Sequence, residues 1–115
     1  MLYIKNDEEL LSHGNVELRR AAIDIIDHGI KNADPYVQVK KLVHVDGRTL
    51  HVGNDSFDLN HYTRIYVLGA GKATFPIAKA LDDVLGELIT DGVVICKYGQ
   101  EGELKHQRLY HSSHP

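Results

Sequence analysis

A glycine-lysine turn is the segment of this sequence with the clearest chemical potential. The segment "YVLGAGKATFPIAKAL" contains an apolar run, then Gly69, Gly71 and Lys72, and then residues at helical spacing. Glycines at a strand-to-helix turn let the backbone approach a ligand closely. The helix that follows presents unpaired N–H groups and the positive end of its dipole. With the charge of Lys72 added, the turn predicts a site for an anion such as a phosphate or a carboxylate.

Two familiar nucleotide-binding motifs do not fit this turn. The P-loop pattern G-x-x-x-x-G-K-[ST] fails because Tyr66 occupies the first glycine position and Ala73 the hydroxyl position. The dinucleotide pattern G-x-G-x-x-G lacks its third glycine, which is Thr74 here, and the next strand ends at Lys97 without an acid. A structural alternative stays open, in which the glycines only permit a tight turn and close packing of the helix on the strand.

Charged residues near this turn supply further candidates. Lys97 and Tyr98 follow the second apolar strand, so they either face a ligand or simply end the strand. Both residues would then lie at the carboxyl edge of the sheet, where open α/β folds bind ligands. Asp82 and Asp83 lie on the helix after the turn, and we expect them to form a solvated face rather than a catalytic acid pair.

The eight histidines do not predict a metal site. His111 and His114 are three residues apart, but no second cluster with ligand spacing accompanies them. We expect these histidines to be solvated or to lie at a strand edge. His44 and His51 stand in opposite arms of an expected hairpin, where a cross-strand pair is the simpler interpretation.

The first half of the chain is expected to hold helices and a hairpin. A short first helix begins at Asn6, and a longer one runs from about Val16 to Lys31 with Asn15 as its cap. Pro35 ends the longer helix and makes Asp34 extended. The helix has one apolar stripe, with Asp27 among the polar residues away from it; the stripe consists of Leu18, Ala22, Ile25, Ile26 and Ile30. A hairpin follows, with arms at 42–45 and 49–52 and a turn at Asp46-Gly47. Residues 53–62 form a polar connection.

The second half predicts one strand–helix–strand unit. The strand Arg64 to Leu68 lacks clean alternation, which suggests that both of its faces are covered, as in a parallel sheet. A helix with Pro76 in its first turn and Gly86 at its end follows. The segment "DGVVICKYG" is a second strand, and a last short strand lies near Leu109. The fold class is therefore α/β, a partial Rossmann-like three-layer domain. We treat residues 1–115 as one truncated domain with a helical lead-in (1–35) and an α/β part (42–115).

Composition narrows the class of protein. The chain has 115 residues, 43% of them hydrophobic, and a formal net charge of −3, so no basic surface for nucleic acid is expected. No apolar run approaches the roughly 20 residues that cross a bilayer, and the N-terminus does not resemble a signal peptide. Cys96 is most simply a core residue in a reducing compartment. We expect a cytoplasmic protein without nucleic-acid or membrane partners.

The order of these motifs resembles the N-terminal part of the MOFRL-type glycerate 2-kinases, some of which are called hydroxypyruvate reductases. The resemblance rests on "ADPY", "VLGAGKA" with its helix, "DGVVICKYG" and the terminal His114-Pro115. It implies phosphorylation of D-glycerate to 2-phosphoglycerate by ATP with Mg²⁺. Lys72 is then the catalytic cation, and the pocket is lined by Gly69, Ala70, Gly71 and Ala73. Lys97 joins these candidates because of its place at the end of the second strand. No residue is assigned to a metal.

The resemblance also sets an expectation for what the isolated chain can do. Family members are several times longer, with the active site between two lobes, and we expect this chain to be inactive by itself. The alternative interpretation is a non-catalytic α/β module. In that case its uncovered sheet edge pairs with a second copy of the chain or with a partner that supplies the missing lobe.

Overall fold

The computed structural model describes residues 2–114, and the chain divides into two compact units at the bond between Asp34 and Pro35. The first unit contains helices α1 (Asp7–Leu10) and α2 (Val16–Ala33). Within the described residues no helix combines the length and the apolar character that a bilayer span requires.

Helix α2 forms where the sequence predicts it, but its buried side differs from the expected one. The Asn15 side chain accepts a hydrogen bond from the Leu18 amide at 3.1 Å, which confirms the predicted cap. The residues buried within the unit are Ile23 and Asp27, whereas Leu18 and Ile25 of the apolar stripe are 67% and 73% exposed. The carboxylate of Asp27 can be buried because hydrogen bonds from the backbone amides of Tyr3 and Ile4 offset the loss of its hydration. The N-terminal segment therefore folds back onto the side of α2 that the stripe does not occupy.

Pro35 separates α2 from a helix that the sequence analysis missed. Asp34 has a ψ of 114°, the extended conformation that a following proline imposes. Helix α3 (Pro35–Leu42) begins at this proline. Proline is favourable as the first helical residue because its missing N–H would be unpaired there in any case.

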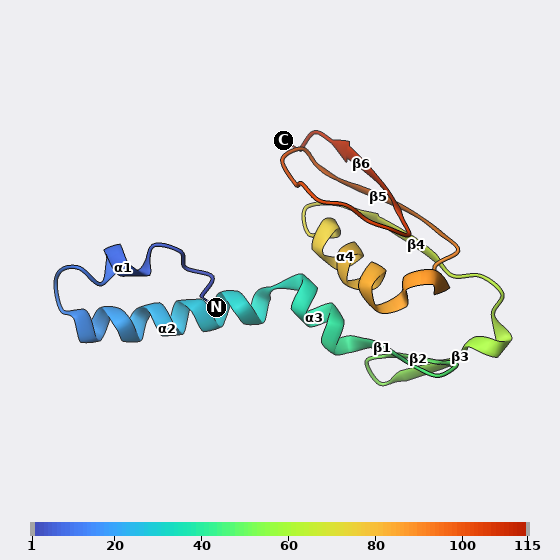
Figure 1. The fold of residues 1–115 in the computed structure, drawn as a ribbon, viewed down its shortest axis with the longest axis horizontal. Helices are drawn as coiled ribbons and strands as arrows, with labels where there is room; N and C mark the ends of the chain where they lie inside the picture. The colour runs from blue at the N-terminus through green and yellow to red at the C-terminus, as the bar shows by residue number, and fades with distance from the viewer. Residues whose placement is uncertain (1, 115) are drawn as a thin grey trace. The chain divides into compact units, whose positions relative to one another are not determined.

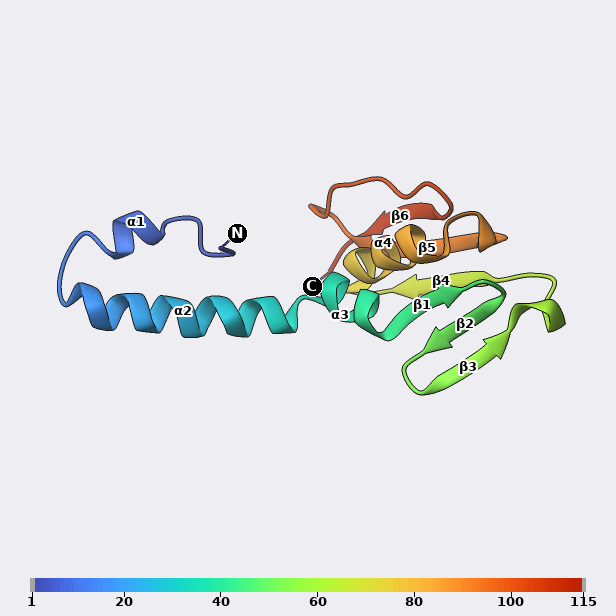
Figure 2. The same cartoon turned by 60° about the horizontal axis from the view of Figure 1, so that its bottom comes forward.

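An antiparallel sheet of three strands follows α3 (Figure 2). The predicted hairpin is confirmed as β1 (Val43–Asp46) and β2 (Thr49–Val52). Its turn lies one residue later than expected, at residues 47–48, because Asp46 pairs with Thr49. The second turn, at residues 53–54, leads into β3 (Asp55–Asp58), which replaces part of the expected polar connection. Both turns begin with a glycine of positive φ, as two-residue hairpins require.

The histidines of this hairpin form the expected cross-strand pair. His44 lies opposite His51 in the register, and their rings stack with centroids 4.6 Å apart. The pair is at the surface, and the His51 ring also hydrogen-bonds to the Ser56 hydroxyl at 2.9 Å.

The second sheet is parallel and contains the predicted strand–helix–strand unit. Strands β4 (Tyr66–Ala70), β5 (Asp91–Lys97) and β6 (Arg108–Ser112) lie in the order β4-β5-β6. Helix α4 (Thr74–Leu85) connects β4 to β5 and packs on one face of this sheet (Figure 1). Single 3-10 turns, η1 (Leu59–His61) and η2 (Gly86–Leu88), precede β4 and follow α4. The α/β fold class is confirmed.

The two faces of the parallel sheet differ sharply. On the α4 side, Val67, Val94 and Cys96 are buried, as predicted for the single cysteine. On the other side, Leu68 is 81% exposed, and Tyr66, Ile95 and Tyr110 are also exposed. The expectation that the first strand is covered on both faces is therefore wrong for this chain, and that strand begins at Tyr66 rather than Arg64. Of the expected three layers, the described residues supply one helical layer and the sheet.

A buried carboxylate fixes the long connection between β5 and β6. Asp82 of α4 is 3% exposed and accepts hydrogen bonds from the backbone amides of Lys105 (2.7 Å) and His106 (2.9 Å). The Gln107 side chain adds a third at 3.2 Å and also donates to the Ala78 carbonyl at 2.9 Å. The expectation of a solvated Asp82 is wrong, because the β5–β6 loop (residues 98–107) crosses this face of α4.

Gly92 makes room for this arrangement. A Cβ atom at this position would lie 2.7 Å from Cγ of Gln107 and 3.1 Å from the Val67 carbonyl oxygen. Asp83, one residue along α4, behaves as expected for a solvated residue and pairs with Lys79 at 2.8 Å. Its carboxylate also accepts a hydrogen bond from the Tyr36 hydroxyl.

We predict that Asp82→Asn lowers the free energy of unfolding by about 2–3 kcal/mol at pH 7, measured by urea denaturation. Burial alone would raise the pKa of the Asp82 carboxyl, but the donors from Lys105, His106 and Gln107 outweigh it and lower the pKa. The contribution of Asp82 is therefore full above the unfolded-state pKa of about 3.9 and is lost as the pH falls through the lower folded-state value.

The stability difference between the unchanged chain and Asp82→Asn should accordingly shrink as the pH is lowered from about 5 to about 2. Asp83→Asn is the matched control, because Asp83 is a neighbouring carboxylate at the surface, and it should cost much less. Equal losses for the two variants would contradict a special role for Asp82.

Candidate functional site

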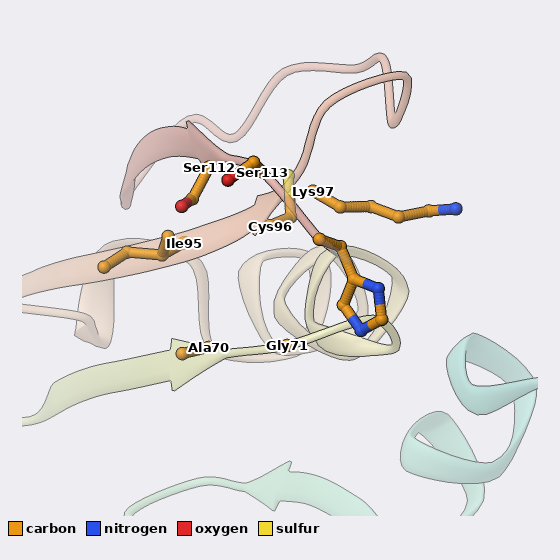
Figure 3. A pocket seen from close by; sticks show the side chains of 8 residues that line it. Ala70, Gly71, Ile95, Cys96, Lys97, Ser112 and Ser113 are labelled. Carbon is orange, nitrogen blue, oxygen red and sulfur yellow. The ribbon is translucent and has the colours of Figure 1, made fainter.

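A hollow lies where the three parallel strands end. Its volume is about 210 Å³, and Figure 3 shows that the ends of β4, β5 and β6 meet around it. The lining residues are Ala70, Gly71, Ile95, Cys96, Lys97, Ser112, Ser113 and His114. The carboxyl edge of a parallel sheet is the usual ligand-binding edge of open α/β folds. The strands therefore converge on the edge where the sequence analysis expects a ligand.

The glycine-lysine turn (residues 69–73) forms one wall of this hollow. Gly71 has a φ of 122°, which side-chain-bearing residues rarely adopt, and its amide donates to the Ile95 carbonyl at 3.1 Å. Its own carbonyl accepts from the Thr74 amide at 3.3 Å. At Gly69, a Cβ atom would lie 3.0 Å from the methyl group of Thr74. The conformation of Gly71 and the close packing at Gly69 each require a glycine, as the structural alternative proposed. The same features leave room for a ligand beside the turn.

Some of the polar groups of the turn remain unpaired in the part of the chain that the structure describes. Within residues 2–114, neither the Lys72 amide nor the Ala73 amide donates a hydrogen bond, and α4 has no side-chain cap at its N-terminus. The Lys72 side chain is exposed, and its ammonium group has no carboxylate partner in the described part of the chain. Lys72 is not among the residues that line the hollow. Its charge is therefore available at the rim, next to unpaired N–H groups.

The structure brings only some of the predicted site residues together. Ala70, Gly71 and Lys97 line the hollow, and the Lys97 side chain extends past the end of β5 (Figure 3). Gly69 instead lines a second, apolar hollow of about 330 Å³ between β4 and α4. Ala73 lies in the turn but lines neither of these two hollows. The predicted residues thus occupy one turn and one strand end.

Strand β6 contributes residues to the hollow that were not expected from the sequence. Ser112 and Ser113 add hydroxyl groups to the wall opposite Gly71 (Figure 3). His114 also lines the hollow, whereas its neighbour Pro115 is outside the described residues. The signal was present in the segment "HSSHP", because a third parallel strand near Leu109 must end at the same edge as Lys97. The register confirms this, since Lys97 lies opposite Ser112.

The groups at this edge suit an anion better than a metal ion. Backbone amides, two lysine ammonium groups and two serine hydroxyls can all donate to phosphate or carboxylate oxygens. No aspartate or glutamate lines the hollow. Within residues 2–114, no group of three or more histidine, cysteine or acidic side chains is arranged to hold a metal ion.

The chain is similar to a known protein family and to proteins of known name. Residues 21–115 match a family described as a domain of unknown function (DUF4147). The chain is 32% identical over 100 residues to the glycerate 2-kinase of Pyrococcus horikoshii, covering 87% of this chain and 22% of that protein. It is 30% identical over 99 residues to the D-glycerate 2-kinase of Thermotoga maritima, covering 85% of this chain and 20% of that protein.

A solved structure agrees with this similarity. The crystal structure of the PH0495 protein from Pyrococcus horikoshii OT3 superimposes with a TM-score of 0.72 at 33% sequence identity, over 85% of this chain and 22% of that one. The chain thus spans about a fifth of the length of these relatives. The match to the family and the similarity to these relatives identify the family of this chain. The chain belongs to the DUF4147 family, the N-terminal domain of the MOFRL-type glycerate 2-kinases.

Proposed function

We propose that this chain forms part of the active site of an ATP-dependent D-glycerate 2-kinase. The observation that carries the proposal is the anion-binding edge, where Lys72 and two unpaired amides stand beside the hollow at the ends of β4, β5 and β6. The similarity to a protein named D-glycerate 2-kinase supplies the substrate. ATP and D-glycerate are both anions, so this donor set suits either of them.

In the proposed reaction, the 2-hydroxyl oxygen of D-glycerate forms a bond to the γ-phosphorus of ATP. The bond from that phosphorus to the bridging oxygen of ADP breaks, and the hydroxyl proton is released. The protein's main contribution to such a transfer is positioning and charge stabilisation. Lys72 would stabilise charge on the transferring phosphoryl oxygens or orient the glycerate carboxylate. The amides of Lys72 and Ala73 would donate to the same anion, with Gly69, Ala70 and Gly71 allowing its close approach.

Lys97 and the β6 end would complete this side of the pocket. Gly71 and Lys97 line the same hollow from the ends of two neighbouring strands, so a bound anion could be contacted from both. Mg²⁺ would neutralise phosphate charge in such a kinase. The residues lining the hollow include no carboxylate for it, so we assign no residue of this chain to the metal.

The proposal also explains why we expect little turnover from this chain by itself. Phosphoryl transfer depends on groups held around both the nucleotide and the acceptor. The chain corresponds to about a fifth of its relatives' length, and further groups would come from the remaining portion. We therefore test ligand binding rather than catalysis.

We predict that Lys72→Ala weakens binding of Mg²⁺–ATP or D-glycerate to the 115-residue chain by about ten-fold, since a charge-assisted hydrogen bond is lost. Isothermal titration calorimetry measures both affinities. Lys105→Ala is the matched control, because Lys105 is an exposed lysine whose main-chain amide, rather than its side chain, contacts Asp82. Equal affinities in all three proteins, or no binding to any of them, would contradict the proposal.

A second candidate function is self-association through the uncovered sheet face. Tyr66, Leu68, Ile95 and Tyr110 expose apolar surface on neighbouring strands, and β4 is an edge strand beside the apolar hollow. Exposed apolar patches of this kind commonly mark interaction surfaces. A homodimer formed through this face would not require a bound ligand.

For this candidate, we predict concentration-dependent dimerisation that Leu68→Gln weakens, measured by sedimentation equilibrium. Leu68 is 81% exposed, so the substitution removes apolar contact area without opening a core cavity. Leu18→Gln is the control, because Leu18 is a similarly exposed leucine on α2, outside this sheet. A chain that stays monomeric at all concentrations would exclude this function.

A further inference from the structure

The glycine-lysine turn is fastened to the β5–β6 loop by one side chain. Nε2 of Gln100 donates a hydrogen bond of 2.7 Å to the carbonyl oxygen of Lys72. These residues are 28 positions apart in the sequence, so the contact exists only in the folded chain. In the described part of the chain, it is the one hydrogen bond from a loop side chain to the backbone of the turn.

Gln100 is itself held from the third strand. Nε2 of His111, on β6, lies 3.0 Å from the Gln100 carbonyl oxygen, and the His111 ring stacks on Tyr98 with centroids 6.2 Å apart. Because a carbonyl oxygen can only accept, His111 must carry its proton on Nε2 for this bond. The backbone of Gln100 is also tied to β5 through its amide, which donates to the Lys97 carbonyl at 3.4 Å.

The contact to the Lys72 carbonyl determines the direction of the Ala73 amide, one of the two unpaired amides of the turn. The Lys72 carbonyl and the Ala73 N–H belong to one planar trans peptide group, so they point in opposite directions. Holding the oxygen therefore also fixes the direction of the Ala73 N–H. That amide donates no hydrogen bond within residues 2–114, and it adjoins the exposed Lys72 side chain.

The Gln100 side chain is less favourable for folding stability than an apolar side chain of similar length would be. Its Oε1 atom is buried and has no hydrogen-bond partner in the described residues, which costs free energy. Exchanging its oxygen and nitrogen would place two acceptors against each other at Lys72, so the assigned orientation follows from the contact. An apolar side chain of the same length would avoid the unpaired oxygen but could not donate to Lys72.

We propose that Gln100 is a positioning residue for the anion site, which holds the Lys72–Ala73 peptide in its binding orientation while His111 holds Gln100. The binding part of this inference rests on the proposed function, whereas the ordering of the turn does not. Gln100 acts through the turn and is not itself a ligand contact.

The test compares Gln100→Met with the unchanged 115-residue chain in two measurements. Methionine preserves the length of the side chain and removes the donor. Amide hydrogen exchange followed by NMR should be about five-fold faster at Gly71, whose amide donates to Ile95, and at Thr74, whose amide donates to the Gly71 carbonyl. Exchange should be unchanged at Val94 in the core. Affinity for Mg²⁺–ATP, measured by calorimetry, should fall by about the same factor.

Two further variants separate positioning from a general structural role. Gln107→Met makes the same chemical change at the other glutamine of the loop with a buried unpaired Oε1, so it should lower global stability and leave exchange at Gly71 and Thr74 unchanged. His111→Phe keeps a ring beside Tyr98 but removes the donor to Gln100, and it should speed exchange at Gly71 and Thr74 in the same direction as Gln100→Met.

The outcomes distinguish failure of this inference from failure of the proposed function. Unchanged exchange at Gly71 and Thr74 in Gln100→Met would overturn the positioning role. Faster exchange with unchanged Mg²⁺–ATP affinity would overturn its link to binding. If Lys72→Ala also leaves that affinity unchanged, the proposed function has failed, while the ordering of the turn by Gln100 still holds.

Discussion

The carboxylate of Asp82 holds the α/β unit together at the connection between β5 and β6, and at 3% exposure Asp82 is the most deeply buried polar residue in the described part of the chain. Parallel strands need a long connection, and the one between β5 and β6 contains no helix that could satisfy its own backbone. Asp82 solves this problem by accepting from two consecutive loop amides and from Gln107. Since Gln107 immediately precedes β6, the same carboxylate fixes where the third strand begins. The β6 wall of the candidate site is thus fixed at the end of the strand opposite to the hollow.

One wall of the candidate site is built from neighbouring residues, and the other is built from residues far apart in the sequence. The glycine-lysine turn is local, and its geometry follows from the conformation of Gly71 and the close packing of Gly69 on Thr74. The opposite wall, with Ser112 and Ser113, depends on the parallel register of β5 and β6. Gln100 connects these parts, because it contacts the turn with its side chain and β6 with its backbone. The geometry of the turn is therefore set by neighbouring residues, whereas the opposite wall is set by the pairing of distant strands.

Elements with strong sequence patterns could be predicted, and weakly patterned ones could not. Helix α4 has an apolar stripe at helical spacing, and strand β5 has a continuous apolar run. Helix α2 has a cap that the structure confirms. All four residues of β3 are exposed, so no burial pattern indicates a strand, and only the Gly53-Asn54 turn could have done so. The side of α2 that is buried and the burial of Asp82 both depend on amides from distant segments. Composition and periodicity cannot reveal such partners.

The absence of a side chain at Gly92 has a consequence for redesigning the β5–β6 connection. Gln107 occupies the volume that a methyl group at position 92 would need. Its side-chain amide can therefore reach Asp82 only because residue 92 has no side chain. Position 92 on β5 and position 107, directly before β6, therefore form a size-matched pair. A different loop placed between these strands would keep its geometry only if position 107 had an unbranched polar side chain and position 92 remained glycine.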